Sequence, residues 1–178
     1  MAENADRLNE WFGLASFPTY IRPLERTQFL SAIYELKTEF SVELAQLVKL
    51  SGSNNLAGAI SESVCFLWVV TEDGRVLLCL EEVCQLSHAQ SRFLRTRGLP
   101  LSSELATLGH PLLVGLGEAR IAGELFCQST PDGRIWTING KSGRYSVGSG
   151  KKVGHLENVA VFFRSAGVDV SVDPYSME

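Results

Sequence analysis

The spacing of hydrophobic and polar residues along this chain predicts helices toward both ends and strands between them. From Thr27 to Leu50, apolar residues recur at steps of three and four, which is typical of one buried stripe on a helix. A second amphipathic stretch runs from His155 to Ala166 and ends before Gly167, a residue type favoured just after helices. Residues 6–14 predict a short additional helix near the N-terminus.

Short apolar segments in the middle of the chain predict a β-hairpin. Residues 64–70 and 76–80 flank Asp73-Gly74, and an Asp-Gly pair supplies the positive φ that a tight turn needs. Both segments are apolar on both faces. We therefore expect them at the centre of a sheet that is covered on each side.

A second pair of segments completes the predicted sheet. Residues 119–127 and 134–138 predict another hairpin, and the alternating residues 168–172 predict an edge strand. Together these elements predict an α+β fold. It would have a central, mainly antiparallel sheet, with the long N-terminal helix on one face and the C-terminal helix on the other. In this interpretation, residues 1–63 are a helical segment packed on an α+β core domain of residues 64–178.

The composition is that of a folded globular protein, with 45% hydrophobic and 20% charged residues. The formal net charge is −4 and the basic residues are scattered, so a nucleic-acid partner is not expected. No apolar run approaches the ~20 residues of a membrane span, and the first residues are acidic and polar, unlike a secretory leader. We expect a protein that is cytoplasmic, or delivered into a target cell without a cleaved signal peptide.

Cysteine and histidine spacing gives no indication of a metal site or a cofactor. Cys65, Cys79, Cys84 and Cys127 lie in or beside the predicted strands, and none pairs with another at the Cys-x-x-Cys spacing of structural zinc sites. Buried, reduced thiols are expected. The alternative, a nucleophilic cysteine, lacks a histidine neighbour in the sequence.

The densest group of chemically versatile residues lies between His110 and Tyr145. His110 and Glu124 are the candidate catalytic residues, because imidazole and carboxylate groups exchange protons near neutral pH. Ser142, Arg144 and Tyr145 are the candidate ligand-binding residues, since a guanidinium beside an aromatic ring suits phosphate or carboxylate recognition. No metal ligand is predicted among them.

These residues also have structural interpretations, which the sequence leaves open. Ser142-Gly143 is typical of a tight turn, and His110 is a plausible hydrogen-bonded capping residue. Arg144 has Glu124 as a possible ion-pair partner that would tie two strands together. A Ser142–His110–Glu124 triad lacks the Gly-x-Ser-x-Gly elbow of serine hydrolases.

A separate basic segment, His88–Arg97, predicts a short helix or a loop. Its three arginines, Arg92, Arg95 and Arg97, stand beside Phe93 and are suited to docking an acidic partner or a phosphate. A solvated loop is the alternative.

The order of motifs from about residue 65 to residue 172 resembles the C-terminal part of the plant IQ-motif-containing proteins. Similar uncharacterised domains occur in bacteria, some of them in toxin-like or secreted proteins. The matching positions are His110, Ala122-Gly123-Glu124-Leu125, Gly133, Ser142-Gly143-Arg144-Tyr145 and Val168-Asp169.

This chain departs from the family pattern at informative positions. Pro111 and Leu112 stand where the family has two serines, and Arg144 stands where it has a second histidine. A catalytic activity of the family therefore does not carry over unchanged. The chain has no Ile-Gln-x-x-x-Arg-Gly sequence, so the resemblance does not imply calmodulin binding.

Two classes of function are expected from these observations. The first is an effector or toxin-type domain whose polar cleft binds an anionic ligand, such as a nucleotide, and transfers a group from it. His110 and Arg144 would orient that ligand, and Glu124 would act as acid/base or bind ribose. The alternative is a non-catalytic acidic module, such as an immunity or adaptor protein. A protein partner is expected, a nucleotide-like small molecule is a further candidate, and no cofactor is implied.

Overall fold

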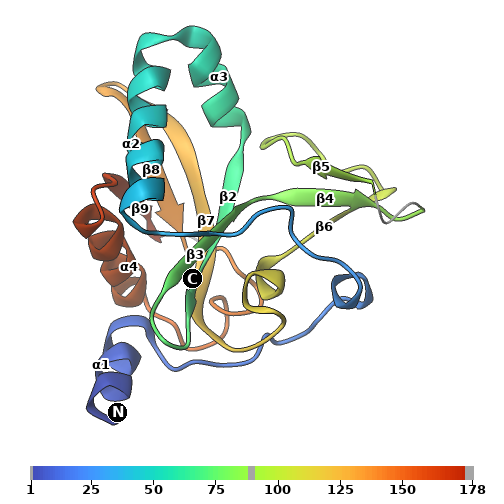
Figure 1. Ribbon diagram of the computed structural model, residues 1–178, viewed down its shortest axis with the longest axis vertical. Helices are drawn as coiled ribbons and strands as arrows, with labels where there is room; N and C mark the ends of the chain where they lie inside the picture. The colour runs from blue at the N-terminus through green and yellow to red at the C-terminus, as the bar shows by residue number, and fades with distance from the viewer. Residues whose placement is uncertain (1, 88–90, 175–178) are drawn as a thin grey trace.

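The computed structural model describes residues 2–87 and 91–174 (Figure 1). In this part of the chain, the main sheet has the strand order β1-β3-β2-β7-β8-β9. Its neighbouring strands are antiparallel, except for the parallel pair β8–β9. The strands are β1 (Tyr34–Glu35), β2 (Cys65–Thr71), β3 (Val76–Leu80), β7 (Ala119–Thr130), β8 (Gly133–Asn139) and β9 (Val170–Asp173). The predicted α+β fold with a mainly antiparallel sheet is confirmed.

Both predicted hairpins are present. In β2–β3, Val70 pairs with Val76 around a turn whose Gly74 has a φ of +86°, a conformation that favours glycine. In β7–β8, Thr130 pairs with Gly133. Every residue of β2 is buried, as expected for a central strand, and β9 forms the predicted edge strand.

Helices precede and follow the strands, as the sequence indicated. The helices are α1 (Ala2–Phe12), α2 (Thr38–Ser53), α3 (Asn55–Ser63) and α4 (Val153–Ser165), with 3₁₀ turns η1 (Pro23–Arg26) and η2 (His110–Val114). The two longest, α2 and α4, lie on the same face of the sheet. Leu44 of α2 and Phe163 of α4 share one core cluster with Trp68 of β2. The expectation of helices on opposite faces is wrong, because an apolar stripe shows that a helix is covered but not by which face of a sheet.

The other face of the sheet is covered by irregular chain. Leu67 and Val69, which alternate with the residues facing the helices, pack against Leu112 of η2 and Tyr145 of the segment that follows β8. The two faces of β2 therefore support two separate apolar clusters. This second face positions most of the candidate site residues.

The predicted helix over Thr27–Leu50 is wrong in nearly its first half, residues 27–37. The helix begins at Thr38, and Tyr34 pairs instead with Leu78 of β3. Phe29, which the helical pattern placed on a buried stripe, is 67% exposed. The segment takes an extended path because backbone pairing with the edge of β3 outweighs its local periodicity.

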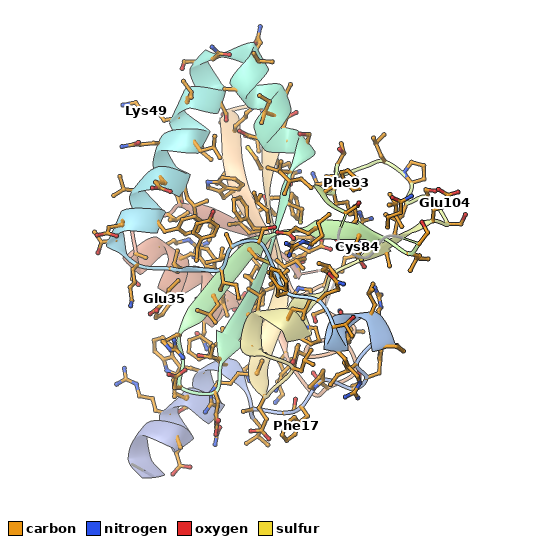
Figure 2. All side chains as sticks on the ribbon, turned by 45° about the vertical axis from the view of Figure 1, so that its right-hand side comes forward. Phe17, Glu35, Lys49, Cys84, Phe93 and Glu104 are labelled. Carbon is orange, nitrogen blue, oxygen red and sulfur yellow. The ribbon has the colours of Figure 1, made fainter. Side chains whose placement is uncertain are left out.

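A small second sheet extends from the end of β3, away from α2 and α4 (Figure 1). Its strand order is β5-β4-β6, with β4 (Glu82–Gln85), β5 (Arg92–Leu94) and β6 (Leu105–Thr107). Figure 2 places Phe93 and Glu104 on this extension. The segment 88–97 was expected to be a helix or a loop, but its residues Arg92–Leu94 form strand β5. Residues 88–90 of this segment lie outside the described residues.

All four cysteines are free and buried, as expected. None of the described helices is long and apolar enough to cross a membrane. Nor do three or more His, Cys, Asp or Glu side chains gather as possible metal ligands anywhere in residues 2–87 and 91–174.

Candidate functional site

The five candidate site residues separate into two environments. His110 of η2 and three residues of the segment after β8, Ser142, Arg144 and Tyr145, are buried. Glu124, in contrast, lines an open cleft at one end of the strands of the main sheet. The structure therefore does not gather all five into one cavity.

Arg144 is held in a buried ion pair with Glu25 of η1. Its Nη1 donates to Oε1 of Glu25 at 2.7 Å and to Oε2 at 2.5 Å. The side chains of Arg144 and Glu25 are only 7% and 0% exposed. The backbone N–H of Gly109 donates to the same Oε1 at 3.1 Å. The expected partner of Arg144 was Glu124, and the structure shows Glu25 instead.

His110 forms a hydrogen bond inside the protein. Its Nε2 lies 2.9 Å from the carbonyl oxygen of Gly123, and the residue is 7% exposed. The pKa of His110 is lowered to about 4, chiefly by burial and to a smaller extent by the guanidinium of Arg144, while the Gly123 hydrogen bond and Glu25 oppose the shift. The imidazole is therefore neutral at pH 7 and donates Nε2–H to Gly123.

Tyr145 and Ser142 are also integrated into the core. The hydroxyl of Tyr145 donates to the carbonyl oxygen of Gly117 at 2.8 Å, and burial raises the pKa of this phenol. Ser142 lies in a turn in which its carbonyl oxygen accepts from the N–H groups of Ser146 and Val147. The Oγ of Ser142 is buried and has no hydrogen-bond partner among the described residues. These contacts agree with the turn interpretation of Ser142-Gly143.

Glu124 faces a cleft of about 560 Å³ beside the segment that follows β5. Asn139 of β8, its cross-strand neighbour, donates from Nδ2 to Oε2 of Glu124 at 3.1 Å. The Oδ1 of Asn139 accepts from the backbone N–H groups of Glu124 and Lys141, both at 3.0 Å. The cleft is lined by the main sheet, by α3 and by the segments after β3, β5 and β8: Glu62, Cys65, Glu81, Arg95, Arg97, Gly98, Glu124, Phe126, Asn139, Lys141 and Asp173.

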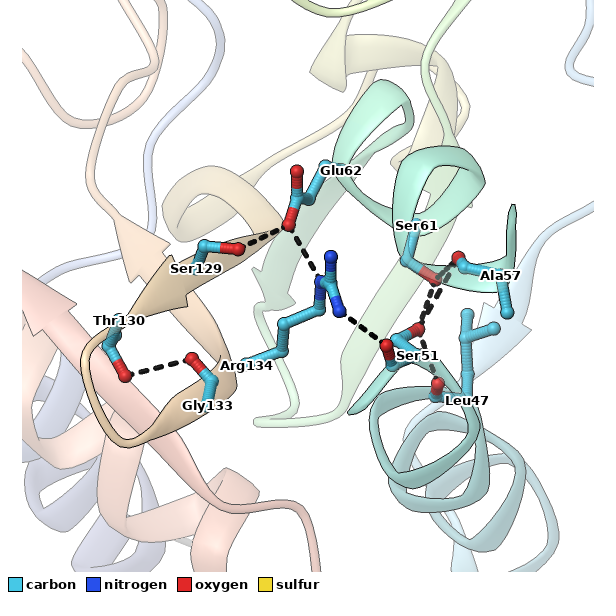
Figure 3. A network of polar contacts seen from close by, with 9 residues as sticks. All are labelled: Leu47, Ser51, Ala57, Ser61, Glu62, Ser129, Thr130, Gly133 and Arg134. Carbon is cyan, nitrogen blue, oxygen red and sulfur yellow. Dashed lines mark hydrogen bonds and ion pairs between the residues drawn. The ribbon is translucent and has the colours of Figure 1, made fainter. Parts of the chain in front are cut away.

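Two carboxylates of the cleft are paired with arginines of the protein itself. Glu81 lies 2.7 Å from Nη1 of Arg95, although burial still raises the pKa of this carboxyl group. Glu62 accepts from Ser129 and from Nε of Arg134 (Figure 3), and these two hydrogen bonds lower its pKa. Neither carboxylate is therefore an unopposed negative charge.

Arg97 and Lys141 are the two cationic side chains of the cleft for which no ion pair is seen among the described residues. The guanidinium carbon of Arg97 lies 3.8 Å from the ring centroid of Phe126, and the backbone N–H of Arg97 donates to Ser63 at 2.7 Å. Within the described residues, neither Arg97 nor Lys141 forms an ion pair. The Nε of Arg95 is also buried, and no described residue accepts a hydrogen bond from it. The cleft thus contains side-chain N–H donor groups of Arg95, Arg97 and Lys141 for which no acceptor is seen among the described residues.

Three cleft residues, Arg97, Asn139 and Lys141, were not among the predicted site residues. The basic segment His88–Arg97 did signal Arg97 as a candidate for docking an anion. Only the pairing of β7 with β8 brings Asn139 and Lys141 beside Glu124.

No protein-family model, no curated protein and no solved structure matches this chain. The similarity to the C-terminal part of the IQ-motif-containing proteins therefore stays a prediction. The structure therefore defines an α+β domain with a polar cleft that is lined by side chains of both charges.

Proposed function

We propose that this protein is a binding module that holds an anionic, nucleotide-like ligand in the cleft beside Glu124. The observation that carries the proposal is the placement of Arg97 and Lys141, two cations without an ion-pair partner among the described residues, in one cleft with Glu124. The cleft volume of about 560 Å³ falls within the ~300–1,000 Å³ typical of small-molecule sites.

The chemistry of the cleft suits a ligand with an anionic group and several hydroxyl or amino groups. Guanidinium and ammonium groups donate charge-assisted hydrogen bonds to phosphate or carboxylate. Glu124, already oriented by Asn139, accepts hydrogen bonds from ribose hydroxyls or exocyclic amines. Arg97 is held against Phe126, so little side-chain freedom is lost when it binds an anion.

The buried positions of the other candidate residues support binding rather than group transfer. A general acid or base must reach the proton that it exchanges with the ligand. His110 is neutral and bonded to Gly123 inside the protein. The guanidinium of Arg144 already donates to both carboxylate oxygens of Glu25 inside the protein. We therefore assign these two residues a structural role and restrict the proposed site to the cleft.

Calorimetric titration with adenosine monophosphate, adenosine and inorganic phosphate tests the proposal. The variants Arg97→Gln and Lys141→Gln each remove one charge-assisted donor, worth roughly 1.5–3 kcal/mol, and should weaken monophosphate binding by about 10- to 100-fold. Glu124→Gln should weaken binding of the monophosphate and of adenosine but leave phosphate binding unchanged.

The matched controls are Arg26→Gln and Lys49→Gln, which remove exposed cations outside the cleft; Lys49 lies on the outer side of α2 (Figure 2). Both controls should bind like the unmodified protein. The proposal fails if the unmodified protein binds none of the three ligands at millimolar concentration. It fails equally if the controls and the cleft variants lose affinity alike.

A further inference from the structure

A second, smaller pocket lies between the N-terminal segment that contains β1 and the β4–β5 hairpin of the small sheet. It has a volume of about 220 Å³ and contains Glu82, which is only 4% exposed. Oε1 of Glu82 accepts from the backbone N–H of Ser31 at 3.0 Å. Oε2 is buried and receives no hydrogen bond from any residue of 2–87 and 91–174. The pocket thus holds a carboxylate oxygen that still needs a donor.

The basic residue that lines this pocket does not satisfy the carboxylate. Arg92 also lines the pocket, but its Nη1 donates to the carbonyl oxygen of Phe29 at 2.5 Å. Its guanidinium carbon lies 4.2 Å from the centroid of the Phe29 ring. Glu82 takes part in no ion pair with the described basic residues. A buried carboxylate oxygen left in this state is unfavourable, which points to an external donor.

The other walls of the pocket are apolar and reach the surface. Tyr34 is 37% exposed, Phe93 is 53% exposed and Leu94 is 54% exposed. Aromatic walls around a buried carboxylate are suited to an alkyl stem that ends in a cation. The volume lies below the ~300 Å³ at which small-molecule sites begin, so a single side chain fits better than a whole metabolite.

We propose that this pocket receives a lysine or arginine side chain of a protein partner. The cationic end donates to Oε2 of Glu82, and the aliphatic stem packs against Tyr34 and Phe93. The net charge of −4 favours the approach of a basic partner. This inference does not depend on the anion cleft, because the two sites share no lining residue and bind groups of opposite charge.

The amide of Ser31 provides a specific reporter, since it donates to the other oxygen of Glu82. In ¹⁵N-resolved NMR titrations, N-acetyl-lysine N-methylamide should shift this resonance saturably, and the arginine analogue should do the same. N-acetyl-norleucine N-methylamide, which has the stem without the charge, should shift it at least about tenfold less, the loss expected for one charge-assisted contact. Equal shifts with norleucine would overturn the proposal, and so would no shift with either cation.

Two variants separate the pocket from general charge effects. Glu82→Gln keeps an oxygen for Ser31 but removes the anion, and it should abolish the response to the lysine probe. Glu104→Gln, an exposed carboxylate on the same extension (Figure 2), should leave that response intact. Equal responses in Glu82→Gln and in the unmodified protein would reject Glu82 as the recognition group.

A third variant keeps the test valid if Glu82→Gln does not fold. Leu94 pairs with Glu82 across β4 and β5, so the two side chains share one face. Leu94→Lys places an ammonium group within reach of Oε2 and should fill the site, so that the lysine probe no longer shifts Ser31. Leu99→Lys, at a residue that is exposed and does not line the pocket, should not block the probe. Undiminished binding to a folded Leu94→Lys variant would contradict the inference.

Discussion

Arg144 and Glu25 stand 119 positions apart in the sequence and form a buried, two-oxygen ion pair. Glu25 belongs to the N-terminal segment and Arg144 to the turn after β8. The pair therefore fastens the N-terminal segment to the second face of the sheet. A Cβ atom added to Gly109 would overlap the Arg144 guanidinium, so a larger residue there would displace one partner of the pair. Arg144, which the sequence predicted to bind a ligand, thus links the N-terminal segment to the turn after β8.

Breaking this ion pair should be strongly destabilising. Glu25→Ala leaves the guanidinium of Arg144 buried without its carboxylate, and such a change typically costs ~3–5 kcal/mol. Lys37→Gln breaks the surface pair with Glu35 and should cost about 1 kcal/mol or less. Urea unfolding measures both values. A loss from Glu25→Ala as small as that from Lys37→Gln would show that the pair is hydrated rather than buried.

The stability of the protein should decrease as the pH falls from about 6.5 to about 4. Burial gives His110 a folded pKa of about 4, whereas its ordinary value is 6.5. Between these values the unfolded chain binds a proton that the folded chain does not, so acid favours unfolding. The His110 contribution is fully present above pH 6.5, and its complete loss is worth on the order of 3 kcal/mol.

Urea midpoints at several pH values, together with an NMR titration of the His110 ring, test this dependence. The variant His110→Gln keeps a donor for Gly123 but does not titrate, so its stability should fall less steeply over the same pH range. A ring that titrates near pH 6.5 in the folded protein would contradict the buried, neutral state.

The sequence predicted the elements whose signals are local. The Asp73-Gly74 turn fixes the β2–β3 hairpin within a few residues of chain, and the apolar stripe of α4 continues to its end at Ser165. The segment Thr27–Lys37 was misassigned because its structure depends on a distant partner. Tyr34 joins the edge of β3, and no periodicity within the segment reports that contact.

The candidate site was less predictable, for the same reason. Glu25 carried no signal, because its role exists only beside Arg144. Residue types suited to catalysis also serve as structural anchors when they are buried, as His110 does against Gly123. The sequence marked Glu124 by its residue type, but the β7–β8 register was needed to place it beside Asn139 and Lys141 in one cleft.

The four cysteine thiols should react slowly in the folded protein. All are buried, and burial raises the pKa of Cys65, Cys84 and Cys127. Few thiolates therefore form at neutral pH, and reagents cannot reach them. Labelling with a thiol reagent, followed by mass spectrometry, should show all four modified only in urea. Rapid labelling of Cys65 without denaturant would show that its thiol is reached from the cleft, which Cys65 also lines.

Gly123 should be the least replaceable residue of β7. A Cβ atom on Gly123 would overlap the carbonyl oxygen of Asn139 and lie 2.8 Å from Cζ2 of Trp68, its fully buried cross-strand neighbour. The backbone of β8 cannot retreat without breaking its pairing with β7. Overpacking of this kind costs about 1–3 kcal/mol and occasionally more, so we expect Gly123→Ala to cost at least about 3 kcal/mol.

The matched control for Gly123 is Gly52, where an added methyl group meets no atom within 4 Å and the backbone is helical. Gly52→Ala should stabilise the protein by about 0.5–1 kcal/mol, because alanine favours the helix more than glycine. Gly123→Ala should also weaken monophosphate binding, since Asn139 both orients Glu124 and takes the added strain. If Gly123→Ala raised stability as Gly52→Ala does, β7 and β8 would not be paired in the register that forms the cleft.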